Sequence, residues 1–201
     1  TIDATTIGVE GLTVNSSGVT TFGNGSSDDK VGASIALASL TTDAAGSTVL
    51  KSTSVTTTGD QSYHDSVTLA GNNLTPNATL SGVNISFDGT IDATATGGQG
   101  LTVNASGATT FGDGLGNDSV GTTKLAYLTT DSSGSTVIKA TNISTTGDQS
   151  FLDSVVLTSN DQSATKTLTS NNLTFGNTVD GTLAGAQNLT VIAGGDVLLA
   201  N

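Results

Sequence analysis

GSTVLKSTSVTTTGDQSYHDSVTL at residues 46–69 returns as GSTVIKATNISTTGDQSFLDSVVL at residues 134–157, with identity at 16 of 24 positions. The repetition extends outward from this pair, because TIDAT stands at both 1–5 and 90–94 and a third copy begins at residue 178. We therefore divide the chain into repeat 1 (residues 1–89), repeat 2 (residues 90–177) and partial repeat 3 (residues 178–201). Self-similarity at this length is typical of stacked repeat architectures.

Short runs of β-forming residues alternate with turn clusters inside each repeat. In repeat 1, Tyr63, Asp65, Val67 and Leu69 alternate with small or polar residues, which predicts a strand with one buried face. The equivalent residues of repeat 2 predict the same strand. Between residues 22 and 40 repeat 1 has one residue more than repeat 2, so we expect a surface loop or an irregular turn in 23–39 and 112–127.

Two all-β architectures fit this pattern, a β-solenoid and tandem Ig-like sandwiches of about 90 residues each. Large residues are scarce, since aromatic residues make up 3% of the chain and Trp, Met and Cys are absent. Val, Leu, Ile, Thr and Ala can fill a narrow coil but suit a sandwich core about 10 Å thick poorly. The repeat junction at 86–93 also has no proline or polar linker. The sequence thus favours a parallel β-helix of roughly 88-residue repeats, each about four turns long.

The formal net charge is −12, from 17 acidic residues and five basic ones, all lysine. Such a chain lacks the basic surface that nucleic-acid binding requires, so we expect no nucleic-acid partner. No apolar run is long enough to span a membrane, so we also expect no membrane insertion. Because the chain starts at a repeat boundary and stops inside a copy, we expect it to be a fragment of a longer protein.

The segment DGLGNDSV at 113–120 resembles the glycine- and aspartate-rich repeats that bind Ca²⁺ between successive turns. Asp113, Asn117 and Asp118 are therefore the candidate metal ligands. Such sites need several tandem copies, and the counterpart at 24–29 has lost the glycine spacing. An ordinary polar loop is the alternative reading, and no other cofactor is expected.

Catalytic residues are not expected, and we predict that the chain is not an enzyme. Asp65 and Asp153 share the apolar face of their strands, but four turns would separate them by roughly 19 Å. Paired glycosidase carboxylates need about 5–9.5 Å. We interpret both as strand-end or corner aspartates bonded to backbone amides. The only histidine, His64, aligns with Leu152 and is not part of the repeated unit.

Four motifs occur in both repeats: GLTVN (11–15, 100–104), TTFG (20–23, 109–112), LTTD (40–43, 128–131) and TTGDQS (57–62, 145–150). In these motifs the chain resembles the repeat regions of large bacterial surface proteins, the filamentous-haemagglutinin-like or β-strand-repeat adhesins. The resemblance spans essentially the whole chain and implies a right-handed β-helix, export to the bacterial cell surface and a role as a shaft or fibre. It supplies no functional residues.

These observations favour a structural segment of an extracellular fibre or adhesin. Its expected partners are other copies of itself, end to end or side by side as a filament or homo-oligomer, and host or matrix glycans. Two alternatives stay open. One is a lateral ligand- or calcium-binding module built on the variable segments 23–39 and 112–127, and the more remote one is a β-helix enzyme that degrades polysaccharides.

Overall fold

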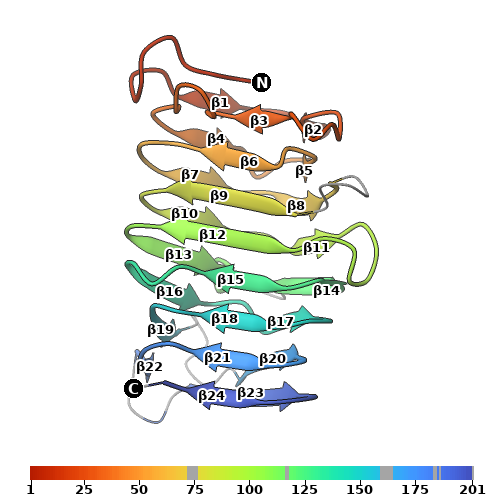
Figure 1. Ribbon diagram of the computed structural model, residues 1–201, viewed down its shortest axis with the longest axis vertical. Coiled ribbons are helices and arrows are strands. Elements are labelled where there is room, and N and C mark those ends of the chain that lie inside the picture. Colours follow the sequence, from red (N-terminus) through yellow and green to blue (C-terminus); the bar gives the residue numbers. More distant parts are fainter. Residues whose placement is uncertain (72–76, 116–117, 159–164, 183–184, 186, 201) are drawn as a thin grey trace.

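The computed structural model describes residues 1–71, 77–115, 118–158, 165–182, 185 and 187–200. Within these ranges the chain forms 24 β-strands and no helix, wound into a right-handed coil of about seven turns (Figure 1). Every strand pairs in parallel with strands one turn away. The predicted parallel β-helix is confirmed. Tandem Ig-like sandwiches are excluded, because sandwiches are built from antiparallel strands.

Three eight-stranded sheets form the sides of the coil, and each turn contributes one strand to each sheet. Sheet 1 contains β1 (Leu12–Val14), β4 (Leu40–Thr42), β7 (Gln61–Tyr63), β10 (Ile85–Phe87), β13 (Ala108–Phe111), β16 (Ser135–Ile138), β19 (Ser154–Leu157) and β22 (Val179–Gly181). Sheet 2 contains β2 (Val19–Phe22), β5 (Ser47–Leu50), β8 (Ser66–Leu69), β11 (Ile91–Ala93), β14 (Ser119–Leu125), β17 (Asn142–Thr145), β20 (Thr165–Ser170) and β23 (Asn188–Ala193). Sheet 3 contains β3 (Lys30–Val31), β6 (Ser54–Thr56), β9 (Ala78–Gly82), β12 (Leu101–Ala105), β15 (Leu128–Thr130), β18 (Gln149–Phe151), β21 (Leu173–Phe175) and β24 (Val197–Leu199).

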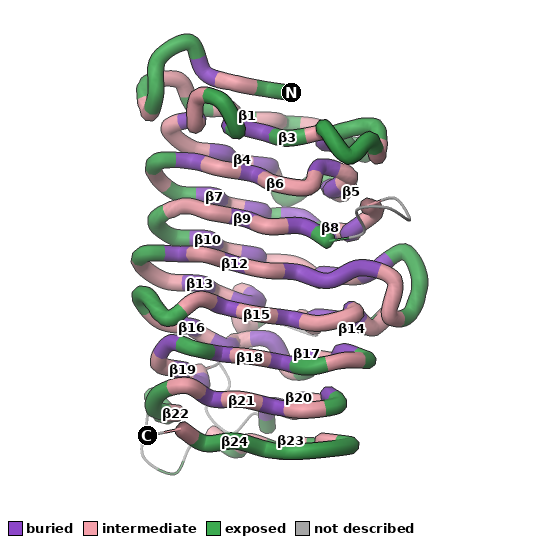
Figure 2. The backbone as a smooth tube through the Cα atoms, viewed as in Figure 1, coloured by how far each residue is buried: buried purple, intermediate pink, exposed green. Residues whose placement is uncertain are grey.

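Alternation of side chains along each strand fills the interior (Figure 2). Inward-facing Tyr63, Phe87 and Phe111 stack in sheet 1, with ring centroids 5.2 and 5.8 Å apart. Phe151 and Phe175 stack in the same way in sheet 3, at 5.7 Å. Stacking at nearly one strand spacing allows large rings into a coil that the composition predicts to be narrow.

The strand predicted through Tyr63, Asp65, Val67 and Leu69 is interrupted. All four side chains are buried as expected, but the chain bends at Asp65 and continues as a strand of a different sheet. Alternation persists through the bend because the polar side chain of Asp65 also points inward, where its carboxylate accepts hydrogen bonds from the hydroxyls of Thr42 and Thr48. Periodicity therefore identified the buried face, and the interpretation of Asp65 as a strand-end or corner aspartate identified the bend.

One repeat corresponds to eleven strands, since β1 is equivalent to β12 and β11 to β22. At three strands per turn this is three and two-thirds turns, which refines the expected four. The fraction has a geometric effect: β1 lies in sheet 1, whereas its equivalent β12 lies in sheet 3. Each repeat is thus rotated by a third of a turn relative to the one before it, and rises about 18 Å along the axis.

The variable segments contain the irregular turn of each repeat. In repeat 2 the pairing of β14 with β17 shifts register between Val120 and Leu125, so the intervening residues bulge. Gly121 begins the bulge with φ +79°, and a Cβ there would lie 2.1 Å from the Ser144 carbonyl oxygen. Gly32 of repeat 1 has φ +70° and the same close approach, to Thr56. Glycine is required at both positions.

Candidate functional site

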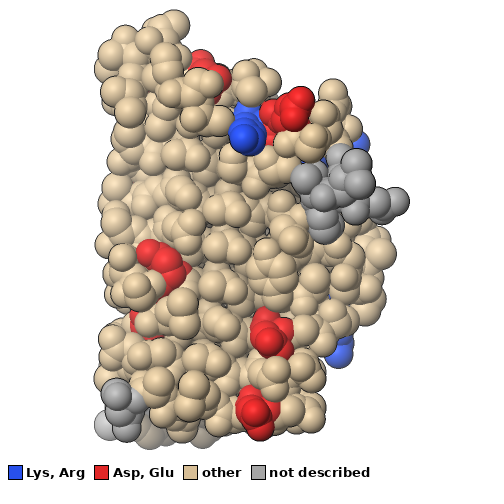
Figure 3. All heavy atoms as spheres, in the orientation of Figure 1, with Lys and Arg blue, Asp and Glu red and all other residues tan. Residues whose placement is uncertain are grey.

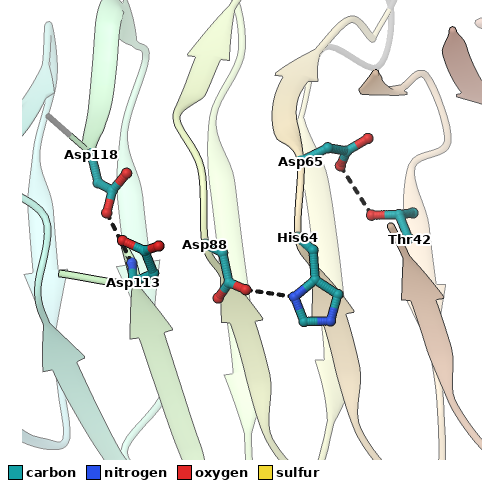
Figure 4. Close-up of polar contacts among 6 residues, drawn as sticks. All are labelled: Thr42, His64, Asp65, Asp88, Asp113 and Asp118. Atoms are coloured by element: carbon teal, nitrogen blue, oxygen red, sulfur yellow. Dashed lines mark hydrogen bonds and ion pairs between the residues drawn. The ribbon is translucent and has the colours of Figure 1, made fainter. Parts of the chain in front are cut away.

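The predicted calcium ligands lie in the loop that leads from β13 into the bulged strand β14. Asp113 and Asp118 are close together (Figure 4), whereas Asn117 lies outside the described residues. The Oδ2 atom of Asp118 accepts hydrogen bonds from the N–H groups of Asp113 (2.9 Å) and Gly114 (3.3 Å). Burial and the neighbouring Asp113 carboxyl raise the pKa of Asp118. These two bonds hold the backbone of Asp113 and Gly114 against the Asp118 carboxylate.

Asp29 is the equivalent of Asp118 in repeat 1. Its Oδ2 atom accepts N–H groups of Asn24 (2.6 Å), Gly25 (2.9 Å) and Ser26 (2.9 Å). These bonds, led by the one from Asn24, lower the pKa of Asp29. The aspartate therefore has the same loop-closing contact in both repeats although the glycine spacing differs. This shared contact is structural and does not require an ion.

The core aspartates Asp65 and Asp153 occupy bends, as the sequence predicts, but their partners differ from the expected amides. Asp65 accepts hydrogen bonds from the hydroxyls of Thr42 (3.0 Å) and Thr48 (2.9 Å; Figure 4). Asp153 accepts the equivalent bonds from Thr130 (3.2 Å) and Thr136 (2.8 Å). Burial raises the pKa of Asp153, partly offset by the Thr136 and Thr130 bonds. Because the repeats are rotated, Asp65 sits between sheets 1 and 2 and Asp153 between sheets 3 and 1.

Two buried glutamines begin equivalent strands and were not singled out from the sequence. Gln61 Nε2 donates to the carbonyl oxygens of Val55 (3.2 Å) and Ser81 (2.9 Å), and its Oε1 accepts the Tyr63 hydroxyl (3.1 Å). Gln149 makes the same two carbonyl contacts in repeat 2. Its Oε1 atom has no hydrogen-bond partner among the described residues, because Phe151 replaces the tyrosine. The signal was present in the alternation, which places Gln61 on the same face as Tyr63.

Asparagine and aspartate side chains link successive turns at the bends. Asp60 Oδ1 accepts the N–H of Asn84 (3.1 Å), and Asn84 Oδ1 accepts the N–H of Ala108 in the next turn (2.9 Å). Repeat 2 has the same column, from Asp148 through Asn172 to Asp196. The Asn172 N–H and the Asn171 side chain lower the pKa of Asp148. Side chains thus satisfy backbone groups where the chain leaves the sheets.

Two further titratable groups stand apart from the repeated design. His64 pairs with Asp88 on the surface (Figure 4), but the equivalent positions in repeat 2 are Leu152 and Gly176. Lys166 is 1% exposed and donates to the Lys139 carbonyl oxygen, at the position of Ala78 in repeat 1. Neither could be assigned from the repeat pattern, because each breaks it.

Comparisons of the chain with protein-family models, curated proteins and solved structures gave no match. Within the described ranges, no three histidine, cysteine or acidic side chains gather as metal binding would require. The same part of the chain contains no helix with the length and apolarity of a membrane span. The site evidence therefore consists of the repeated contacts of the coil itself.

Proposed function

We propose that this chain is a segment of a rigid extracellular shaft that extends a bacterial surface adhesin or matrix protein. The observation that carries the proposal is continuity: all three parallel sheets run through the repeat boundaries, as where β11 pairs with β8 and β14. A coil with no break between repeats resists bending at the junctions. Its length also increases by a constant amount with every repeat.

The repeated polar contacts support the same role. Loop aspartates, bend columns and core aspartates each bind groups of their own chain in both repeats. Asp65 and Asp153 lie at different bends, eleven strands apart, which does not suit the paired carboxylates of a glycosidase. The adhesin context and cell-surface location rest on the resemblance of the repeat motifs.

Electron microscopy of a chain carrying several joined copies of residues 90–177 tests the shaft. We expect straight, stiff particles whose length grows by about 18 Å for each added repeat. Particles that bend freely at the repeat boundaries, or whose length does not scale with repeat number, would contradict it. The unextended chain provides the reference length.

A lateral ligand-binding module is the second candidate, favoured by a hollow of about 400 Å³ beside the bulge of β14. Ser119, Thr122, Lys124 and Asn142 are among the residues that line it. A fibre that binds through this hollow would lose adhesion to cells or matrix glycans when segment 112–127 is exchanged for segment 23–39. A pure shaft would keep its behaviour after the exchange.

A further inference from the structure

The loop between β2 and β3 contains the only Asn–Gly pair of the sequence, Asn24–Gly25. Asparagine followed by glycine is the pair most prone to spontaneous deamidation, because glycine has no Cβ to hinder attack of its backbone nitrogen on the asparagine side chain. Asn24 is exposed, and its loop lies at the N-terminal end of the coil, where acidic side chains reach the surface beside β3 (Figure 3). The loop therefore presents a reactive pair to the solvent.

The Asn24 side chain folds over the backbone that follows it. Its Oδ1 atom accepts the N–H of Ser26 at 2.8 Å, a turn that asparagine side chains commonly form. Because Cγ is bonded to Oδ1, this contact places Cγ near the intervening peptide nitrogen, which is that of Gly25. Gly25 has φ +91°, and its N–H group donates to the Asp29 carboxylate (2.9 Å). The carbon and the nitrogen that must join are thus held close together before the reaction begins.

Repeat 2 has the product of deamidation at the equivalent position. Asp113–Gly114 stands where repeat 1 has Asn24–Gly25, and Gly114 has a similar φ of +83°. The Oδ1 atom of Asp113 accepts the N–H group two residues ahead, as that of Asn24 does. The N–H groups of both pairs donate to an aspartate, Asp29 in repeat 1 and Asp118 in repeat 2. The loop therefore accepts aspartate in place of asparagine with its hydrogen bonds unchanged.

We propose that Asn24 is a modification site, at which the folded chain deamidates spontaneously and so acquires the loop chemistry of repeat 2. A base from the solvent takes the proton of the Gly25 N–H group, and the nitrogen attacks Cγ of Asn24. The C–N bond of the side-chain amide breaks, and its nitrogen takes up a proton and leaves as ammonia. Water then opens the resulting succinimide ring at either carbonyl, which gives aspartate or isoaspartate at position 24. The loop gains one negative charge.

Other asparagines lack one or both of these features. Asn15 is also exposed, in the turn after β1, but the residue that follows it is Ser16, whose Cβ crowds the attacking nitrogen. Asn84 and Asn172 direct Oδ1 at N–H groups of the next turn instead, at 2.9 and 2.8 Å. Their side chains are therefore turned away from the nitrogen that follows them. Both the glycine and the side-chain turn single out Asn24.

Peptide mapping of the full chain by mass spectrometry tests the proposal. The folded chain is kept in mildly alkaline buffer, and the conversion of each asparagine to aspartate or isoaspartate is followed with time. Asn24 should convert at least about tenfold faster than Asn15, because only its side chain and following nitrogen are brought together without a crowding Cβ. The same chain in urea gives the rate that the sequence sets without the fold. Asn24 of the folded chain should convert at a rate close to that reference.

Isoelectric focusing of variants tests the assignment to this residue. The wild-type chain should develop an acidic band with time, and the band should migrate with the variant Asn24→Asp. The variant Asn24→Ser keeps an oxygen for the Ser26 N–H group but has no amide, so it should form no such band. The matched control, Asn15→Ser, should form the band at the wild-type rate. Circular dichroism should show the same β fold for Asn24→Asp as for the wild type.

An Asn24 side chain that stays intact in the folded chain would overturn the proposal, whatever happens in urea. Conversion of Asn15 as fast as that of Asn24 would also overturn it, because the loop would then have no part in the reaction. An acidic band that forms in Asn24→Ser as fast as in the wild type would assign the modification to another residue. The inference does not rest on the shaft role, since the length and stiffness measured by electron microscopy do not depend on one loop side chain.

Discussion

Phe151 and Tyr63 differ by one hydroxyl group, and that group decides whether a buried glutamine is satisfied. The surroundings match, because each ring stacks on a phenylalanine one turn away. Phe151→Tyr should give Gln149 Oε1 its missing donor and raise the free energy of unfolding by about 1 kcal/mol. Tyr63→Phe should lower it by at least a similar amount. Urea unfolding of both variants measures the effect, and two neutral substitutions would contradict it.

Asp153 predicts a pH dependence. Burial raises the pKa of Asp153 above the ordinary 3.8, because the folded state favours the protonated carboxyl. The stabilisation from this preference is fully present below pH 3.8 and is lost as pH rises through the raised pKa. Asp153→Asn keeps an oxygen for the Thr130 and Thr136 hydroxyls but cannot ionise. The wild type should therefore lose stability relative to the variant across this window. Any cost of the new amide is the same at every pH, so parallel curves from urea unfolding would refute the prediction.

At the scale of the element, the bends impose stricter conditions than the strands. Gly134 has φ +72°, and a Cβ there would lie 1.6 Å from the Gly107 carbonyl oxygen in the neighbouring turn. Gly185 has the same φ but nothing within 4 Å. Gly185→Ala should cost about 1–2 kcal/mol from the left-handed backbone alone, and Gly134→Ala should cost clearly more. Thermal unfolding compares the two, and equal losses would show that crowding at the bend is relieved without cost.

Strand positions could be predicted from the sequence more reliably than the bends between them. Alternation at Tyr63 through Leu69 identified the buried side chains, because inward residues in this stretch are larger or more apolar than the His64, Ser66 and Thr68 between them, apart from Asp65. Periodicity alone runs straight through the bend at Asp65, since the bend has neither glycine nor proline and the inward side chain preserves the alternation. The bend was expected only because a buried aspartate is best placed at a strand end or corner. The loop aspartates Asp113 and Asp118 were found, but their backbone partners depend on a loop conformation that composition does not specify.

At the scale of the whole molecule, the number of turns in a repeat could not be predicted from the sequence, because the turns differ in length. Stacked residues are 28 positions apart between Leu12 and Leu40 but only 19 apart between Thr136 and Val155. With turns this unequal, an 88-residue period does not reveal whether it holds a whole number of turns. The particles used to test the shaft should therefore also show successive repeats related by a third of a turn. Repeats that superpose by translation alone would contradict the eleven-strand assignment.

Each repeat contains two-thirds of a turn beyond three whole turns. The number of repeats therefore determines both the length of the shaft and the orientation of its far end about the axis. Loss or gain of one repeat by recombination keeps the coil continuous, but it turns everything beyond that point by 120° about the axis. Only the loss or gain of three repeats, or a multiple of three, restores the original orientation about the axis of a domain carried at the end of the shaft, because three rotations of 120° make a full turn. For this to be tolerated, all three sides must accept the same strands. Each of the eleven strand types occurs in at least two of the sheets here, and the types of β1 and β2 occur in all three.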